Sequence, residues 1–163
     1  MSATTARLFR HSAWASQRIY DAIQELPLDA LESYIRDPEW SVARLLQHIP
    51  GGADWYVYCL TGRPLSNQMK PMSMADVKVL QEQLAEYDAI IATQAELPDE
   101  YLTITEGGKS WQNLRSTILA EAIYHAAEHR TQLVDALEAR GFTSISLDRL
   151  DLWSFESFEK KQE

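Results

Sequence analysis

The chain has 163 residues, of which 45% are hydrophobic and 24% are charged, and its formal net charge at pH 7 is −9. This length suits one domain with a buried core, expected to span residues 1–163, and the negative charge argues against nucleic acid or an anionic membrane surface as a partner. No apolar run approaches the roughly 18 residues of a membrane span, and the single cysteine, Cys59, cannot form an internal disulfide, so we expect a cytoplasmic protein.

The first predicted helix runs from about Ala3 to Leu26, where Pro27 ends it. Its core-facing residues recur at spacings of three and four, which is the period of one helix face. They are Phe9, Ala13, Ser16, Tyr20 and Ile23. A short helical turn over 29–34 and a second turn at Asp37-Pro38-Glu39 are expected to follow.

The second predicted helix begins after Ser41, which has the side chain of a helix N-cap, and ends near Gly62. Its apolar stripe runs beside His48. The sequence Pro50-Gly51-Gly52 follows closely after this histidine. Because proline removes a backbone donor and clashes one turn back, we expect a kink or a local break there.

A loop over 63–72 leads to the third predicted helix, whose start resembles a capping box formed by Ser73 and Asp76. Its apolar residues form a nearly perfect three-four repeat, and Leu97-Pro98 closes it. The repeat consists of Val77, Leu80, Leu84, Tyr87 and Ile91. Residues 101–105 then alternate in a strand-like pattern, so a small hairpin or an extended loop is expected before the last helix.

The fourth predicted helix runs from about Gln112 to Arg140 and stops at Gly141. Four long amphipathic helices with modest connections favour an all-α, up-down four-helix bundle. In this fold the hairpin or extended segment lies just before the last helix.

A tail over 142–163 follows the fourth helix and carries Trp153, Phe155 and Phe158. Aromatic side chains at this density indicate that the tail packs on something. It packs either on its own bundle or on a second copy of the chain, and the second alternative predicts a homodimer.

Two histidines, His125 and His129, lie four residues apart on an apolar face of the fourth helix. Residues at this spacing are about 5–6 Å apart at Cβ, so two imidazoles can converge on one ion. The alternative is a pair of buried histidines satisfied by hydrogen bonds. In a bundle a third ligand comes from a facing helix, and His48 is the best candidate because it lies mid-helix beside an apolar stripe. His11 is the other candidate, but it could equally face solvent.

Three segments resemble sequence patterns of a known protein family in their residues, their order and their spacing. They are Leu8-Phe9-Arg10-His11-Ser12-Ala13-Trp14-Ala15-Ser16, then Leu45-Leu46-Gln47-His48-Ile49 with Asp54-Trp55, then His125-Ala126-Ala127-Glu128-His129-Arg130-Thr131-Gln132. They are similar, in turn, to three patterns of the DinB-like (damage-inducible) family: Tyr-Asn-x-Trp-Ala-Asn, Leu-x-His-Ile with acidic-x-Trp, and His-x-x-x-His-Arg-Gly-Gln. Ser12 and Ser16 stand where the family has asparagine, and Thr131 stands where it has glycine.

The resemblance implies a bundle that holds a divalent metal, zinc or nickel, through His48, His125 and His129. It also implies thiol-dependent transferase or hydrolase-type chemistry on a small-molecule substrate, with a low-molecular-weight thiol as a possible partner, but it names no catalytic residue. A non-catalytic stress-related metal-binding or interaction module is the alternative. A literal match of His125-x-x-Glu128-His129 to the inverted zinc-protease motif is weaker, because only residues 130–163 remain to build a catalytic domain.

Three histidines leave at least one metal position open, and we expect it to face a pocket between helices one, two and four. Glu121, one turn before His125, either supports a ligand histidine or forms a salt bridge, whereas Glu128 is expected to be exposed. Cys59 is interpreted as a small buried hydrophobe. Three aromatic residues either line the pocket or pack in the core: Trp14, Trp55 and Tyr124.

Overall fold

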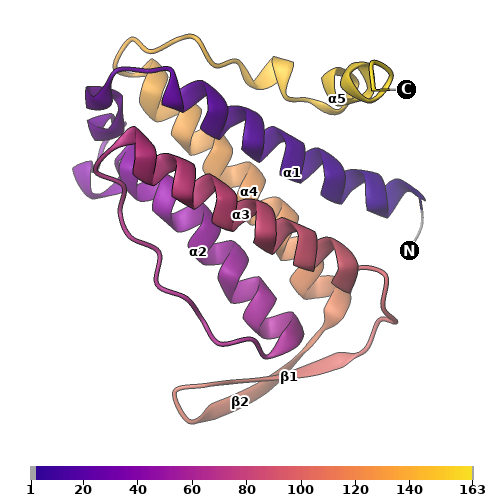
Figure 1. Ribbon diagram of the computed structural model, residues 1–163. Helices are drawn as coiled ribbons and strands as arrows, with labels where there is room; N and C mark the ends of the chain where they lie inside the picture. Colours follow the sequence, from indigo (N-terminus) through magenta and orange to yellow (C-terminus); the bar gives the residue numbers. More distant parts are fainter. Residues whose placement is uncertain (1–2, 163) are drawn as a thin grey trace.

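The computed structural model describes residues 3–162 of the chain (Figure 1). These residues form five α-helices, three short 3-10 helices and a two-stranded antiparallel sheet. The α-helices are α1 (Ala3–Gln24), α2 (Val42–Thr61), α3 (Met74–Gln94), α4 (Arg115–Glu138) and α5 (Leu152–Glu159). The strands are β1 (Tyr101–Glu106) and β2 (Lys109–Leu114), and the 3-10 helices are η1 (Leu28–Glu32), η2 (Pro38–Trp40) and η3 (Leu147–Arg149). The mainly helical prediction is confirmed, and β1 and β2 form the expected hairpin.

The four long helices pack side by side, and α5 lies against α1 (Figure 1). Both α1 and α2 contact α3 and α4, so the apolar faces of all four helices meet in one core. The largest fully buried side chains of that core include Tyr20, Leu46, Tyr87, Leu133 and Leu137. Within residues 3–162, no helix is both long enough and apolar enough to cross a membrane.

The first part of the chain follows its predicted pattern closely. α1 buries Tyr20 and Ile23 completely and ends at Gln24. η1 and η2 occupy the two predicted turns. Asp37 begins η2 by accepting a hydrogen bond from the backbone N–H of Glu39 at 2.9 Å. This cap fixes the short segment that leads into α2.

α2 is a continuous helix from Val42 to Thr61, so of the two alternatives predicted at Pro50, a kink or a local break, the local break is wrong. Proline cannot donate to the carbonyl one turn earlier, which belongs to Leu46. The buried Tyr20 hydroxyl donates a hydrogen bond to that carbonyl oxygen at 2.7 Å. A side chain of α1 therefore replaces the missing backbone bond, and the helix continues through the proline.

The caps of α2 and α3 lie at the predicted positions, but the N-cap residue of α2 does not form the expected side-chain hydrogen bond. Ser41 is the N-cap residue of α2, yet its side chain is buried and makes no capping hydrogen bond. Gly62 ends α2 in the left-handed conformation, with φ of 75°. The capping box of α3 is confirmed: the Ser73 hydroxyl accepts from the Asp76 N–H at 3.2 Å and donates to the Asp76 carboxylate at 2.9 Å.

α4 begins at Arg115 rather than at the predicted Gln112, because residues 112–114 belong to β2. The buried Arg115 guanidinium donates hydrogen bonds to the Pro98 carbonyl oxygen at 3.0 Å and to the Glu100 carboxylate at 2.7 Å. These contacts tie the base of the hairpin to the start of the helix. Strand pairing therefore overrides the helical period, and the predicted start at Gln112 is wrong.

The tail folds back on its own chain through α5. Phe155 is buried, and its ring centroid lies 5.3 Å from that of Trp14 on α1. His11 Nε2 donates a hydrogen bond to the Leu150 carbonyl oxygen at 2.7 Å. His11 and Trp14 therefore anchor the tail, whereas Trp153 remains 78% exposed.

Candidate metal centre

The candidate metal site consists of three histidines that come together from two helices. The ligand atoms of His48 on α2 and of His125 and His129 on α4 all lie within 4.8 Å of one another. The Nε2 atoms of His48 and His125 are 3.2 Å apart. Two nitrogens that bind one zinc ion tetrahedrally at about 2.0–2.1 Å are separated by about 3.3 Å. His48 and His125 therefore already have the spacing of two zinc ligands, and with His129 they form a group that could hold a metal ion.

Gly52 lets the two helices bring their histidines together. A Cβ atom at this position would lie 2.2 Å from Cε1 of His125, far inside van der Waals contact. Gly52 stands one helical turn after His48, so the missing side chain makes room where the imidazole of α4 approaches α2. The glycine is needed for this close approach rather than for flexibility of the helix.

The imidazole of His129 is oriented by its own helix. Its Nδ1 atom lies 2.8 Å from Oε1 of Gln132, one turn further along α4. Because an amide oxygen only accepts, Nδ1 carries the proton, and Nε2 is left with its lone pair free for a ligand. Hydrogen bonding of the second ring nitrogen in this way is common among metal-binding histidines.

Burial favours the neutral form of two imidazoles, those of His125 and His48. Burial, followed by the neighbouring His129 and His48, lowers the pKa of His125 to about 4. Burial and then His129 also lower the pKa of His48 below its usual value of 6.5. Neutral imidazole is the form that binds a metal, so at neutral pH these two side chains need not lose a proton first.

Two aromatic rings enclose the cluster. The Trp40 ring meets the His48 ring edge to face at 5.2 Å between centroids and runs parallel to that of His129 at 6.2 Å. The Tyr56 ring lies edge to face with that of His125 at 5.7 Å. Trp40 was not identified from the sequence, because its role depends on how η2 lies over α2 and α4. The only local signal was its position at the end of a capped turn before the helix of His48.

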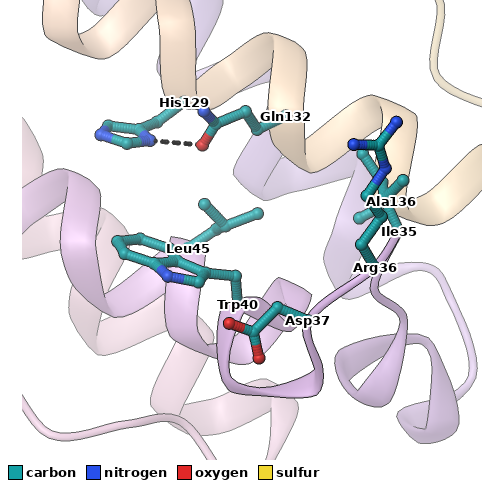
Figure 2. A pocket seen from close by; sticks show the side chains of 8 residues that line it. All are labelled: Ile35, Arg36, Asp37, Trp40, Leu45, His129, Gln132 and Ala136. Carbon is teal, nitrogen blue, oxygen red and sulfur yellow. Dashed lines mark hydrogen bonds between the residues drawn. The ribbon is translucent and has the colours of Figure 1, made fainter.

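A pocket of about 520 Å³ opens beside His129 (Figure 2). Its walls come from the segment between η1 and α2, from α2 itself and from α4. The lining residues are Ile35, Arg36, Asp37, Trp40, Leu45, His129, Gln132 and Ala136. A pocket between helices one, two and four was expected. In the structure the segment 35–40 takes the place of helix one: no residue of α1 lines this pocket, and α1 meets α4 where Arg130 bonds Ser16.

A smaller pocket of about 240 Å³ lies between α2, α4 and the hairpin. It is lined in part by Trp55, Cys59 and Glu121. Glu121 is exposed and lines this pocket. Trp55 also lines it, which was one of the two alternatives predicted for that residue, a pocket wall or the core. Burial raises the pKa of the Cys59 thiol to about 11, which fits a small buried hydrophobe rather than a nucleophile. Tyr124 is 67% exposed, so it neither lines a described pocket nor packs in the core.

Arg130, next to His129 in sequence, lies in a separate buried cluster. Its guanidinium donates hydrogen bonds to the hydroxyls of Ser12 at 3.2 Å and Ser16 at 3.0 Å. Both serines are buried, and they stand where the DinB-like pattern has asparagines. Burial raises the pKa of the nearby Asp88 to about 7, and the charge of Arg130 opposes that shift. This cluster joins α1, α3 and α4.

Comparison with known proteins agrees with the family resemblance of the three sequence motifs. The family model described as DinB family matches residues 1–162. The chain is also similar to Protein DinB of Bacillus subtilis (strain 168), with 22% identity over 159 residues, covering 91% of this chain and 92% of that protein. The chain belongs to the DinB family, and the resemblance inferred from its motifs is confirmed.

Proposed function

We propose that this member of the DinB family binds one divalent metal ion, zinc or nickel, through His48, His125 and His129. The convergence of three imidazoles on one point is the observation that carries the proposal. Imidazole suits both metals, and three ligands leave one position of the usual tetrahedral zinc shell open.

We infer further that the protein is a metalloenzyme with thiol-dependent transferase or hydrolase-type chemistry on a small molecule. A bound ion would supply a Lewis acid that lowers the pKa of a thiol or of water. The chain's own residues would orient and shield the reaction: Gln132 holds the proton of His129 on Nδ1, and Trp40 and Tyr56 cover two sides of the cluster. The adjacent pocket supports an enzyme over a non-catalytic stress or interaction module, because a purely structural metal site needs no such space.

The family and the packing of the four long helices support an up-down four-helix bundle and a single domain over 1–163. We also propose a homodimer. The buried Phe155 no longer supports it, but the exposed Trp153 on the outer side of α5 does. Sedimentation at micromolar concentration tests this proposal, and a mass near the 18.6 kDa of one chain would exclude the dimer. A cytoplasmic location stays a prediction from the single cysteine.

Elemental analysis of protein purified without an affinity tag tests the metal proposal. We expect about one zinc or nickel ion per chain, and we expect its loss in the triple variant His48→Ala, His125→Ala, His129→Ala. His11→Ala is the matched control, because the His11 side chain bonds the C-terminal tail and is not part of the histidine triad. The His11→Ala protein should keep its metal. Unchanged metal content in the triple variant would end the proposal. A thiol-transfer screen on the metal-loaded protein then tests for an enzyme.

A further inference from the structure

We propose that the pocket beside His129 binds an elongated small-molecule carboxylate. Its apolar body fills the pocket, a metal-binding donor atom lies at the histidine end, and the carboxylate lies at the far end beside Arg36. The inference rests on the proposed metal function, because the metal defines the inner end. It adds a shape, a polarity and a charge for the ligand.

The length of the ligand follows from α4. His129, Gln132 and Ala136 line the pocket in succession along one side of this helix. Seven residues of α-helix span about 10 Å. Figure 2 shows His129 at one end of the pocket and the Arg36 side chain, with Ile35 and Ala136, at the other. A ligand that reaches from the histidines to Arg36 must therefore be extended.

The apolar body follows from the walls. Ile35 is 52% exposed and Trp40 is 42% exposed, although both line a concave surface. Leu45 and Ala136 also line the pocket and are buried. Large apolar side chains that remain exposed inside a pocket are typical of small-molecule sites, where the ligand covers them.

The carboxylate follows from Arg36. None of residues 3–162 forms an ion pair or hydrogen bond with its guanidinium, in a chain whose net charge is −9. The neighbouring Asp37 also lines the pocket, but one of its carboxylate oxygens already accepts from the Glu39 N–H. An arginine presents a planar set of donors that matches a carboxylate, so it is suited to bind the far end of the ligand.

The test compares 8-mercaptooctanoate with 8-mercapto-1-octanol, two probes of equal length that differ in the carboxylate. Their affinities are measured by titration calorimetry under reducing conditions, on metal-free and on zinc-loaded protein. We expect the acid to bind about fivefold more tightly than the alcohol in both forms, the upper range for an exposed ion pair. Arg36→Gln should abolish this preference, whereas the matched variant Asp37→Asn should keep it. Zinc should tighten the binding of both probes, and 3-mercaptopropionate, which is too short, should show no dependence on Arg36.

Several results would overturn the inference while leaving the metal proposal intact. One is equal affinity of acid and alcohol in a protein that holds zinc. Another is a preference for the acid that survives Arg36→Gln, since the anion would then bind elsewhere. A third is probe binding that zinc does not change, which would separate the pocket from the metal. If zinc itself fails to bind, the proposed function fails first and the inference falls with it.

Discussion

His129 and Arg130 are neighbours on α4, but their side chains lie in opposite kinds of surroundings. Arg130 is 7% exposed and is held by hydroxyls of Ser12 and Ser16 on α1. His129 is half-buried beside a pocket, and its ring nitrogens meet one helix neighbour, Gln132, and the other two imidazoles. The first residue joins helices together, and the second faces a space that a ligand can enter.

The difference shows what each polar group needs. A buried guanidinium is stable only when its donors are bonded and its charge is opposed, and α1 and Asp88 provide both. The Nε2 atoms of His48 and His125 lie 3.2 Å apart, so either one ring donates a hydrogen bond to the other or a metal ion lies between them. The first region should therefore control the free energy of unfolding, and the second should control metal affinity.

The largest expected effect comes from Arg130→Met. This change leaves the half-buried Asp88 without its opposing charge and the Ser12 and Ser16 hydroxyls without their donor, so we expect the free energy of unfolding to fall by about 3 kcal/mol. Urea denaturation of the metal-free protein measures it. The double variant Arg130→Met, Asp88→Leu should recover at least about 1 kcal/mol, because both charged groups are then gone. A double variant no more stable than the single one would contradict the coupling.

Gly52→Ala should affect the other region alone. The added methyl group would displace the His125 ring, so we expect zinc affinity to fall on the order of tenfold or more. Competition with a chelator dye measures this. Gly51→Ala is the matched control, since a Cβ atom there would lie 3.6 Å from Gln68 Oε1, an ordinary contact. Equal zinc affinity in the two variants would show that Gly52 does not position His125.

The two regions should respond to pH with opposite signs in metal-free protein. The pKa of Asp88 is raised from 3.8 to about 7 in the folded state, so its contribution to stability is lost as pH rises through this range. The pKa of His125 is lowered from 6.5 to about 4, so its contribution is lost as pH falls through that range. Each proton changes stability by at most about 1.4 kcal/mol per pH unit.

Variants separate these contributions. Between pH 4 and 7, Asp88→Asn should gain more stability with rising pH than the parent protein, and His125→Gln should gain less. Urea denaturation at several pH values gives the slopes. If both variants kept the slope of the parent protein, neither group would titrate as its surroundings indicate.

Ser16→Ala carries the smallest expected effect. It removes one hydrogen bond to Arg130, so we expect a loss of about 1 kcal/mol in the free energy of unfolding. Ser12→Ala should cost less, because the Ser12 backbone carbonyl still accepts from the same guanidinium nitrogen at 3.3 Å. Zinc affinity should be unchanged in both. A drop in zinc affinity would show that the two regions are not independent.

Features that depend on residues near in sequence could be predicted. The repeat from Val77 to Ile91 is buried throughout, because a period of 3.6 places these residues on one face of α3. The capping box at Ser73 and the stop at Gly62 follow from local backbone chemistry. The histidine triad could also be proposed, because the spacing of His125 and His129 allows it and the family pattern points to a third histidine.

Features that depend on contacts across the fold could not be predicted. α2 continues through Pro50 because Tyr20, on another helix, bonds the Leu46 carbonyl. The pocket wall over 35–40 and the position of Trp40 depend on how η2 packs over α2 and α4. Neither contact leaves a periodic signal in the chain.

X-ray absorption at the zinc edge of zinc-loaded protein tests the central claim most directly. Three histidines around one ion predict three imidazole nitrogens at about 2.0–2.1 Å and one light ligand that exchanges with solvent. The imidazole signal should fall in His48→Ala, His125→Ala and His129→Ala, and it should not change in His11→Ala. A sulfur ligand at about 2.3 Å, which only Cys59 or a methionine of this chain could supply, or a shell with fewer than three imidazoles, would contradict the account.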